Sequence, residues 1–171
     1  DEGRKYLAPG LFGPCGYGLP AIVGAKIGQP DVPVVGFAGD GAFGIAVNEL
    51  TAICRGDWPA VTQIVFRNYQ WGAEKRNSTL WFDDNFVGTE LDTEVSYAGI
   101  ANACGLKGVA ARTMEELTDV LNTAIKEQME DGVTTLIEVM LNQELGEPFR
   151  RDAMKKPVAV AGVSASDMAA E

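Results

Sequence analysis

The chain has 171 residues, of which 46% are hydrophobic and 8% aromatic, and this size and composition indicate a single globular domain with room for a hydrophobic core. The formal net charge of −10 argues against nucleic acid as a partner, because its phosphates would be repelled. Histidine is absent, which excludes histidine acid–base chemistry and histidine metal ligation within this chain, and no apolar run approaches the roughly 20 residues of a membrane span.

The predicted elements alternate between strand and helix. Thr113 and Glu116 form a capping box that starts one of the helices. In chain order, the pattern predicts a helix over 20–27, a strand over 34–38, a helix over 45–55, a strand over 61–66, a short helix and a loop within 69–85, a helix over 96–104, a short strand near 109–110, a helix from 113 to about 130 and a strand over 134–141. This alternation predicts an α/β fold, a three-layer sandwich with a mainly parallel sheet between helices.

Cysteine usage and the start of the chain indicate the cellular setting. Cys15, Cys54 and Cys104 are odd in number and show no Cys-x-x-Cys spacing, so we expect thiols in a reducing cytoplasm and no zinc site. The sequence opens at Asp1 without an initiator methionine or a signal peptide. We therefore expect a piece of a longer cytoplasmic protein.

Polar residues follow two of the predicted strands. Gly39-Asp40-Gly41 follows the first strand and Asn68 follows the second, and ligands of parallel sheets bind beyond the carboxyl ends of the strands. A glycine turn before a helix can bind an anion through its backbone N–H groups. A carboxylate beside that anion requires a cation between them, and Asp40, Asn68 and the carbonyl of Gln70 offer the oxygen ligands that Mg²⁺ prefers. The alternative is that Gly-Asp-Gly is only a turn.

Several runs carry a resemblance to a known family. The pattern Gly39-Asp40-Gly41 … Asn68 and the glycine-rich run 13–21 resemble the cofactor-binding domain of thiamine diphosphate-dependent enzymes. Runs 66–77 and 142–157 are more specific, and resemble the sulfoacetaldehyde acetyltransferases among these enzymes. The resemblance covers about residues 4–163. It implies that residues 1–163 are the C-terminal diphosphate-binding domain of a larger enzyme, and we expect a disordered tail over 164–171.

The resemblance implies two cofactors, thiamine diphosphate and Mg²⁺. The metal ligands would be Asp40, Asn68 and Gln70. The residues that contact the cofactor would be Gly13, Cys15, Gly39, Asp40, Gly41, Ala42, Asn68, Gln70, Gly72 and Ala73.

The individual roles follow from the same resemblance. Gly41 and Ala42 would offer backbone N–H groups to the diphosphate, and Gly13 and Cys15 would line the aminopyrimidine. Gly72 and Ala73 would pack near the cofactor where a helix begins. Two positions depart from the family: Cys15 stands where relatives often carry methionine, and Arg67 stands where they often carry asparagine.

The activity implied by the resemblance is the conversion of sulfoacetaldehyde and phosphate to acetyl phosphate and sulfite. In this family a glutamate that activates the cofactor lies on a separate N-terminal domain and comes from a neighbouring subunit. We therefore expect no catalytic residue in this chain, a homo-oligomeric enzyme, and little or no turnover by the chain alone.

Alternatives remain open. Another thiamine diphosphate enzyme could carry this domain, such as a 2-oxo acid decarboxylase subunit or an acetolactate synthase-like enzyme, and a non-catalytic nucleotide- or anion-binding module could use the same turn. Arg150 and Arg151 belong to a basic cluster near the end of the chain. This cluster is either a solvated surface or a contact for substrate sulfonate or phosphate.

Overall fold

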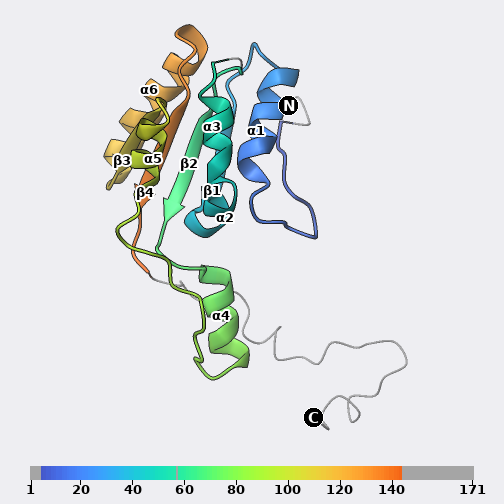
Figure 1. Cartoon of the computed structure of the whole chain (residues 1–171), viewed down its shortest axis with the longest axis vertical. Helices are drawn as coiled ribbons and strands as arrows, with labels where there is room; N and C mark the ends of the chain where they lie inside the picture. Colours follow the sequence, from blue (N-terminus) through green and yellow to red (C-terminus); the bar gives the residue numbers. More distant parts are fainter. Residues whose placement is uncertain (1–4, 57, 144–171) are drawn as a thin grey trace, which may run out of the picture.

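A computed structural model describes residues 5–56 and 58–143 of the chain. The elements, in chain order, are α1 (Gly18–Gly28), β1 (Val35–Gly39), α2 (Asp40–Ile45), η1 (Val47–Glu49), α3 (Leu50–Ile53), β2 (Thr62–Arg67), α4 (Gly72–Trp81), α5 (Tyr97–Ala103), β3 (Lys107–Ala111), α6 (Met114–Glu130) and β4 (Thr135–Met140) (Figure 1).

The strands form one parallel sheet in the order β1-β2-β4-β3. In its register, Gly39 lies opposite Phe66 and Arg67 lies opposite Met140. The strands therefore all end at one edge of the sheet, and the residues that follow β1 and β2 emerge there together. This is the arrangement that the sequence predicted for Asp40 and Asn68.

Apolar side chains are buried on both faces of the sheet. On one face, Leu19 of α1, Phe43 of α2, Leu50 of α3 and Ala101 of α5 pack with residues such as Val65 of β2. On the other face, Ala124 of α6 packs with Ile64 and Ile137, and Leu117, Val120 and Leu121 lie against them. The predicted three-layer α/β architecture, with helices on both faces of a parallel sheet, is confirmed.

The continuous helix predicted over 45–55 is wrong. A short helix begins directly at Asp40, the chain turns at Ala46 with φ −111° and ψ 15°, and η1 and α3 follow. Gly41 and Gly44 weaken helix formation between them, and the break directs Phe43 and Leu50 into the same core. The early start places Asp40 in the first helical turn.

The capping box was predicted correctly. Thr113 Oγ1 accepts a hydrogen bond of 3.1 Å from the N–H of Glu116, and the Glu116 carboxylate accepts one of 2.6 Å from the N–H of Arg112. The helix that follows, α6, carries no membrane-spanning stretch, and neither does any other helix within residues 5–56 and 58–143.

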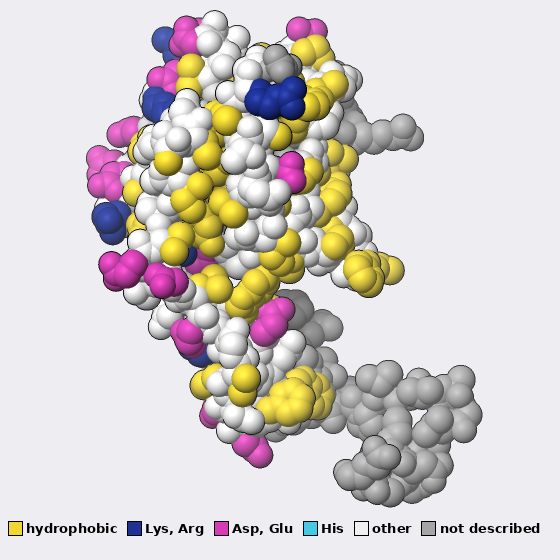
Figure 2. Space-filling view, in the orientation of Figure 1, with side chains coloured by type: hydrophobic (Ala, Val, Ile, Leu, Met, Phe, Trp, Pro, Cys, Tyr) yellow, Lys and Arg dark blue, Asp and Glu magenta, His cyan; other side chains and the backbone are white. Residues whose placement is uncertain are grey.

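The segment around α4 projects beyond the strand ends (Figure 1). Figure 2 shows hydrophobic side chains on the surface of this projection as well as over the sheet layers. Trp81, Phe82 and Phe86 contribute exposed apolar surface there. The two ends of this segment are joined to each other: the N–H of Trp71 donates to the carbonyl of Thr89, and Gln70 and Glu90 form an isolated bridge.

Candidate functional site

Asp40 lies at the junction of β1 and α2, and its side chain is 1% exposed. Its two carboxylate oxygens have different partners. Oδ2 accepts a hydrogen bond of 2.7 Å from the backbone N–H of Tyr69, and Oδ1 accepts one of 3.0 Å from the N–H of Gly41. The carboxylate is therefore oriented by backbone groups from two strand ends.

Burial raises the pKa of the Asp40 carboxyl, and the hydrogen bonds from Tyr69 and Gly41 and the charge of Arg67 oppose that rise. A buried carboxylate with these partners lacks the full counter-charge that would favour its ionised form. A bound cation would supply that charge.

Asn68 and Gln70 follow β2 on either side of Tyr69, which has a left-handed backbone with φ 60°. A non-glycine residue in this region is uncommon and marks a position that the surrounding structure holds in place. Here the turn brings the side chain of Asn68 and the backbone carbonyl of Gln70 to the same point. The amide oxygen of Asn68 lies 2.9 Å from the carbonyl oxygen of Gln70 and 3.1 Å from Oδ1 of Asp40.

These three oxygens, which we call the oxygen trio, face one another. A turn of the Asn68 amide by 180° would place its N–H₂ group there and would form hydrogen bonds to both neighbours. A cation would satisfy the trio without that turn. Octahedral Mg²⁺ holds oxygens at 2.0–2.1 Å, which places adjacent ligands about 3 Å apart. The two separations of 2.9 and 3.1 Å are compatible with that spacing, and they equally suit the hydrogen bonds that the turned amide makes.

The trio contains a single acidic side chain. Among the described residues there is no group of three or more acidic, cysteine or histidine side chains that could hold a metal ion. A site built here would therefore depend on neutral oxygens and on oxygens from the ligand. This composition suits Mg²⁺ bound together with a phosphate group.

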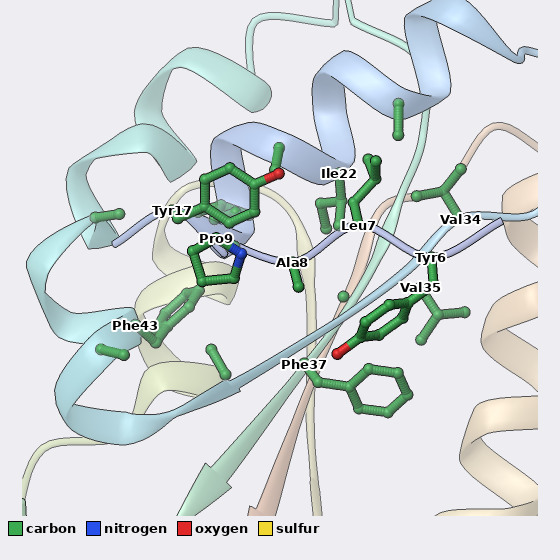
Figure 3. A pocket seen from close by; sticks show the side chains of 18 of the residues that line it. Tyr6, Leu7, Ala8, Pro9, Tyr17, Ile22, Val34, Val35, Phe37 and Phe43 are labelled. Carbon is green, nitrogen blue, oxygen red and sulfur yellow. The ribbon is translucent and has the colours of Figure 1, made fainter. Parts of the chain in front are cut away.

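A cavity of about 1260 Å³ lies on the neighbouring side of β1 and α1. Four of the predicted cofactor residues line it: Gly13, Cys15, Gly39 and Ala42. Figure 3 shows the apolar part of its wall, to which residues of the segment from Tyr6 to Pro9 and Phe37 of β1 contribute. Gly39 precedes Asp40 and Ala42 follows it by two residues, so the turn after β1 contributes both to the cavity wall and to the oxygen trio.

Gly41 approaches a side chain that the sequence interpretation did not assign to it. A Cβ at this position would lie 2.9 Å from the indole ring of Trp71. Glycine was expected here to let a phosphate approach, and the structure shows that it also makes room for Trp71. Gly72 and Ala73, the next two residues, begin α4.

The sequence interpretation missed most of the residues that hold the trio in place. Tyr69 and Tyr97 donate hydrogen bonds to Asp40, Arg67 lies beside its carboxylate, and Glu138 pairs with Arg67. Of these, Arg67 was noted only as a departure from the family. A charged residue at the end of an apolar strand is the one signal that could have identified it. Arg150, Arg151 and the tail over 164–171 lie outside the described residues.

Residues 1–139 match the family described as thiamine pyrophosphate enzyme, C-terminal TPP binding domain. The chain belongs to this family. The expected resemblance to the cofactor-binding domain of thiamine diphosphate-dependent enzymes is therefore confirmed, and the match supports thiamine diphosphate as the cofactor.

Individual thiamine pyrophosphate enzymes differ in their sequence identity to this chain. The sulfoacetaldehyde acetyltransferase of Roseovarius nubinhibens is 83% identical over 168 residues, which are 98% of this chain and 28% of that protein. The acetolactate synthase large subunit of Lactococcus lactis is 28% identical over 82% of this chain and 23% of that protein. The benzoylformate decarboxylase structure from Polynucleobacter necessarius has a TM-score of 0.66 and 28% identity, and covers 80% of this chain and 25% of that one.

The expected resemblance to sulfoacetaldehyde acetyltransferases is thus confirmed, and acetolactate synthases are much more distant. The chain spans about a quarter of the length of the curated relatives that it matches.

Proposed function

We propose that this chain supplies the Mg²⁺ and diphosphate half of the active site of a thiamine diphosphate enzyme. Asp40, Asn68 and the carbonyl of Gln70 would hold the metal. The single observation that carries this assignment is that the Asn68 amide, the Gln70 carbonyl oxygen and Oδ1 of Asp40 converge at the ends of β1 and β2. The raised pKa of Asp40 supports it, because the site is short of positive charge. Phosphate oxygens and water would complete the coordination.

The remaining cofactor contacts would come from the turn after β1 and from the cavity. Gly41 and Ala42 lie in the first turn of α2, where backbone N–H groups have no backbone partner within the helix and can bind diphosphate oxygens. The N–H of Gly41 donates to Oδ1 of Asp40 and would exchange that partner for the diphosphate. Gly13, Cys15 and Gly39 would contact the organic part of the cofactor from the cavity wall. Gly72 and Ala73 would pack beside it at the start of α4. When bound, thiamine diphosphate supplies the carbanion chemistry at the substrate carbonyl, and the protein supplies binding and orientation.

The activity proposed for the longer protein is that of a sulfoacetaldehyde acetyltransferase, which makes acetyl phosphate and sulfite from sulfoacetaldehyde and phosphate. The identity of 83% over 98% of this chain supports it. The activating glutamate would come from another domain of a neighbouring subunit in a homo-oligomer, so the chain alone should show little turnover. The three cysteines are free thiols, which supports a cytoplasmic location.

Two assays separate this proposal from the other thiamine diphosphate activities. The full-length protein should release sulfite from sulfoacetaldehyde only when phosphate is present. A decarboxylase or an acetolactate synthase would instead release CO₂ from a 2-oxo acid. CO₂ release from pyruvate without sulfite release from sulfoacetaldehyde would overturn the acetyltransferase assignment.

A calorimetric titration tests the cofactor itself. The full-length protein with Mg²⁺ should bind thiamine diphosphate and should not bind ATP. The reverse result would favour the nucleotide-binding alternative. The Asp40→Asn variant should lose the Mg²⁺-dependent binding of the cofactor, and an unchanged cofactor affinity with an unchanged Mg²⁺ requirement would contradict the assignment of the metal site.

We also propose that Arg150 and Arg151 contact the sulfonate or the phosphate in the full-length enzyme, because two adjacent guanidinium groups suit anionic oxygens. The double variant Arg150→Ala, Arg151→Ala should raise the KM for sulfoacetaldehyde or for phosphate. Unchanged KM values for both would show that the cluster is a solvated surface.

A further inference from the structure

Arg67 is a charged residue with almost no solvent exposure. It is the last residue of β2 and its side chain is 1% exposed. Its Nη1 lies 3.7 Å from Oδ2 of Asp40, and its Nε lies 3.1 Å from Oε1 of Glu138. One buried cation therefore neighbours two buried carboxyl groups.

The guanidinium is fixed in place by the loop before α5. Its Nη2 donates hydrogen bonds of 2.7 Å to the carbonyl of Asp92 and of 2.6 Å to the carbonyl of Val95. The guanidinium therefore has four neighbouring groups, the carboxyls of Asp40 and Glu138 and the carbonyls of Asp92 and Val95, and these fix its orientation. A lysine has a single ammonium group and cannot reach all of these partners at once.

Two tyrosine rings enclose the same guanidinium. Its central carbon lies 4.6 Å from the ring centre of Tyr69 and 5.0 Å from that of Tyr97. Both tyrosines also hold Asp40: the N–H of Tyr69 donates to Oδ2, and the hydroxyl of Tyr97 donates a hydrogen bond of 3.0 Å to the Asp40 carbonyl. Arg67 thus packs against the residues that fix both the side chain and the backbone of Asp40.

Glu138 of β4 connects Arg67 to the start of α5. Its Oε2 accepts hydrogen bonds of 2.9 Å from the Ser96 hydroxyl and 3.0 Å from the N–H of Ala98. The N-terminus of α5 is therefore tied to β4, and through Arg67 to the ends of β1 and β2. This arrangement leaves Oδ2 of Asp40 facing Arg67 and Tyr69, and Oδ1 facing Asn68.

We propose that Arg67 is a positioning residue that makes Asp40 a one-oxygen metal ligand and thereby favours Mg²⁺ over Ca²⁺ at the oxygen trio. The proposal rests on the Mg²⁺ site of the proposed function. Mg²⁺ requires a near-octahedral set of single oxygens, whereas Ca²⁺ accepts both oxygens of one carboxylate and a larger coordination number. With Arg67 beside Oδ2, only Oδ1 is presented. Without it, the Tyr69 N–H is the one remaining partner described for Oδ2 and its ring loses the packed guanidinium, so the carboxylate is held less firmly and can turn to offer both oxygens.

The test compares metal affinities in the full-length protein with thiamine diphosphate. The readout is the ratio of the Kd for Ca²⁺ to the Kd for Mg²⁺, each measured by calorimetric titration. Loss of the Arg67 charge changes the attraction for both divalent ions in the same direction, so the ratio reports ligand geometry. Arg67→Met should lower the ratio by about tenfold, a loss of selectivity of about 1.4 kcal/mol. Arg67→Lys should lower it less.

Folding and the metal site need separate controls. If Arg67→Met does not fold, the double variant Arg67→Met, Glu138→Gln removes the unpaired carboxylate and should show the same loss of selectivity. Lys107→Met removes an ion pair to Glu127 at the other end of the sheet and should leave the ratio unchanged. Asp40→Asn should abolish tight Mg²⁺ binding.

The outcomes distinguish this inference from the proposed function. A wild-type ratio in the folded Arg67 variants, with Mg²⁺ binding lost in Asp40→Asn, would overturn the role of Arg67 and leave the metal site standing. Tight Mg²⁺ binding retained in Asp40→Asn would overturn both.

Discussion

The backbone N–H of Tyr69 donates a hydrogen bond of 2.7 Å to Oδ2 of Asp40, and this single contact joins the ends of β1 and β2 at the candidate metal site. It uses one carboxylate oxygen and leaves the other beside the amide oxygen of Asn68. The left-handed backbone of Tyr69 makes the contact possible. Variants at these positions test whether the geometry serves metal binding.

Replacement of Asp40 by asparagine should weaken Mg²⁺ binding in the full-length protein by about 100-fold, or about 2.7 kcal/mol. The physical reason is that the trio would lose its only anionic ligand, and Mg²⁺ binds neutral oxygens less strongly. Calorimetric titration with Mg²⁺ at saturating thiamine diphosphate would measure the change. Chelation of the metal from the wild-type protein should release the cofactor to a similar extent. Cofactor retained after chelation would contradict a bridging metal.

Tyr69→Val should destabilise the protein by about 1 to 3 kcal/mol, because a β-branched residue is strained in the left-handed region. Tyr69→Asn should cost less, since asparagine tolerates that conformation. Urea unfolding would measure both. Asp83→Val is a matched control: Asp83 is also left-handed, with φ 46°, but it is exposed in the loop after α4. The Asp83→Val variant should lower the stability and leave the Mg²⁺ affinity unchanged, whereas Tyr69→Val should reduce both.

Gly41→Ala should destabilise the protein by about 1 to 3 kcal/mol, because the new methyl group would overlap the indole of Trp71. A Cβ there would lie 2.9 Å from three ring atoms. Gly24→Ala is the control within α1, where a Cβ would meet nothing within 4 Å. That variant should instead stabilise by about 0.5 to 1 kcal/mol, since alanine favours a helix interior. Thermal unfolding of both variants should show shifts of opposite sign, and equal shifts would contradict the close approach at Trp71.

The pH dependence of Mg²⁺ binding should report Asp40. Its carboxyl pKa is raised above the ordinary value of 3.8, chiefly by burial, and a protonated carboxyl is a poor metal ligand. Mg²⁺ affinity should therefore begin to fall at a higher pH than for an exposed aspartate. The Mg²⁺-dependent rise in Tm, followed from pH 7 downwards, would measure this. An unchanged rise at pH values down to 3.8 would contradict the expected competition between protons and metal.

Without metal, the contribution of Asp40 to folding stability should decrease as the pH rises, whereas Mg²⁺ affinity should increase. Because the folded-state pKa of Asp40 lies above the unfolded value, the folded state binds the proton more tightly. The contribution of this group to stability is therefore fully present at low pH and is lost as the pH rises through the folded-state pKa. The difference in unfolding free energy between the wild type and Asp40→Asn, without metal, should change across that window.

Local patterns in the sequence were sufficient to determine the architecture. The short apolar runs before Asp40 and Asn68 form β1 and β2, and the capping box at Thr113 starts α6. These features depend on interactions between residues close in sequence, and the alternation of strand and helix then leaves a parallel sheet as the arrangement that buries both faces. The places of Asp40 and Asn68 at one sheet edge follow from that topology.

Only the tertiary structure decided how the site is held. The break after α2 depends on the core that Phe43 and Leu50 share, which a local helical pattern does not contain. The burial of Arg67 depends on Glu138, 71 positions later in the sequence, and on the rings of Tyr69 and Tyr97. Such long-range partners determine whether a charge faces solvent or a carboxylate, because the cost of burying it is set by groups that only the folded chain brings together.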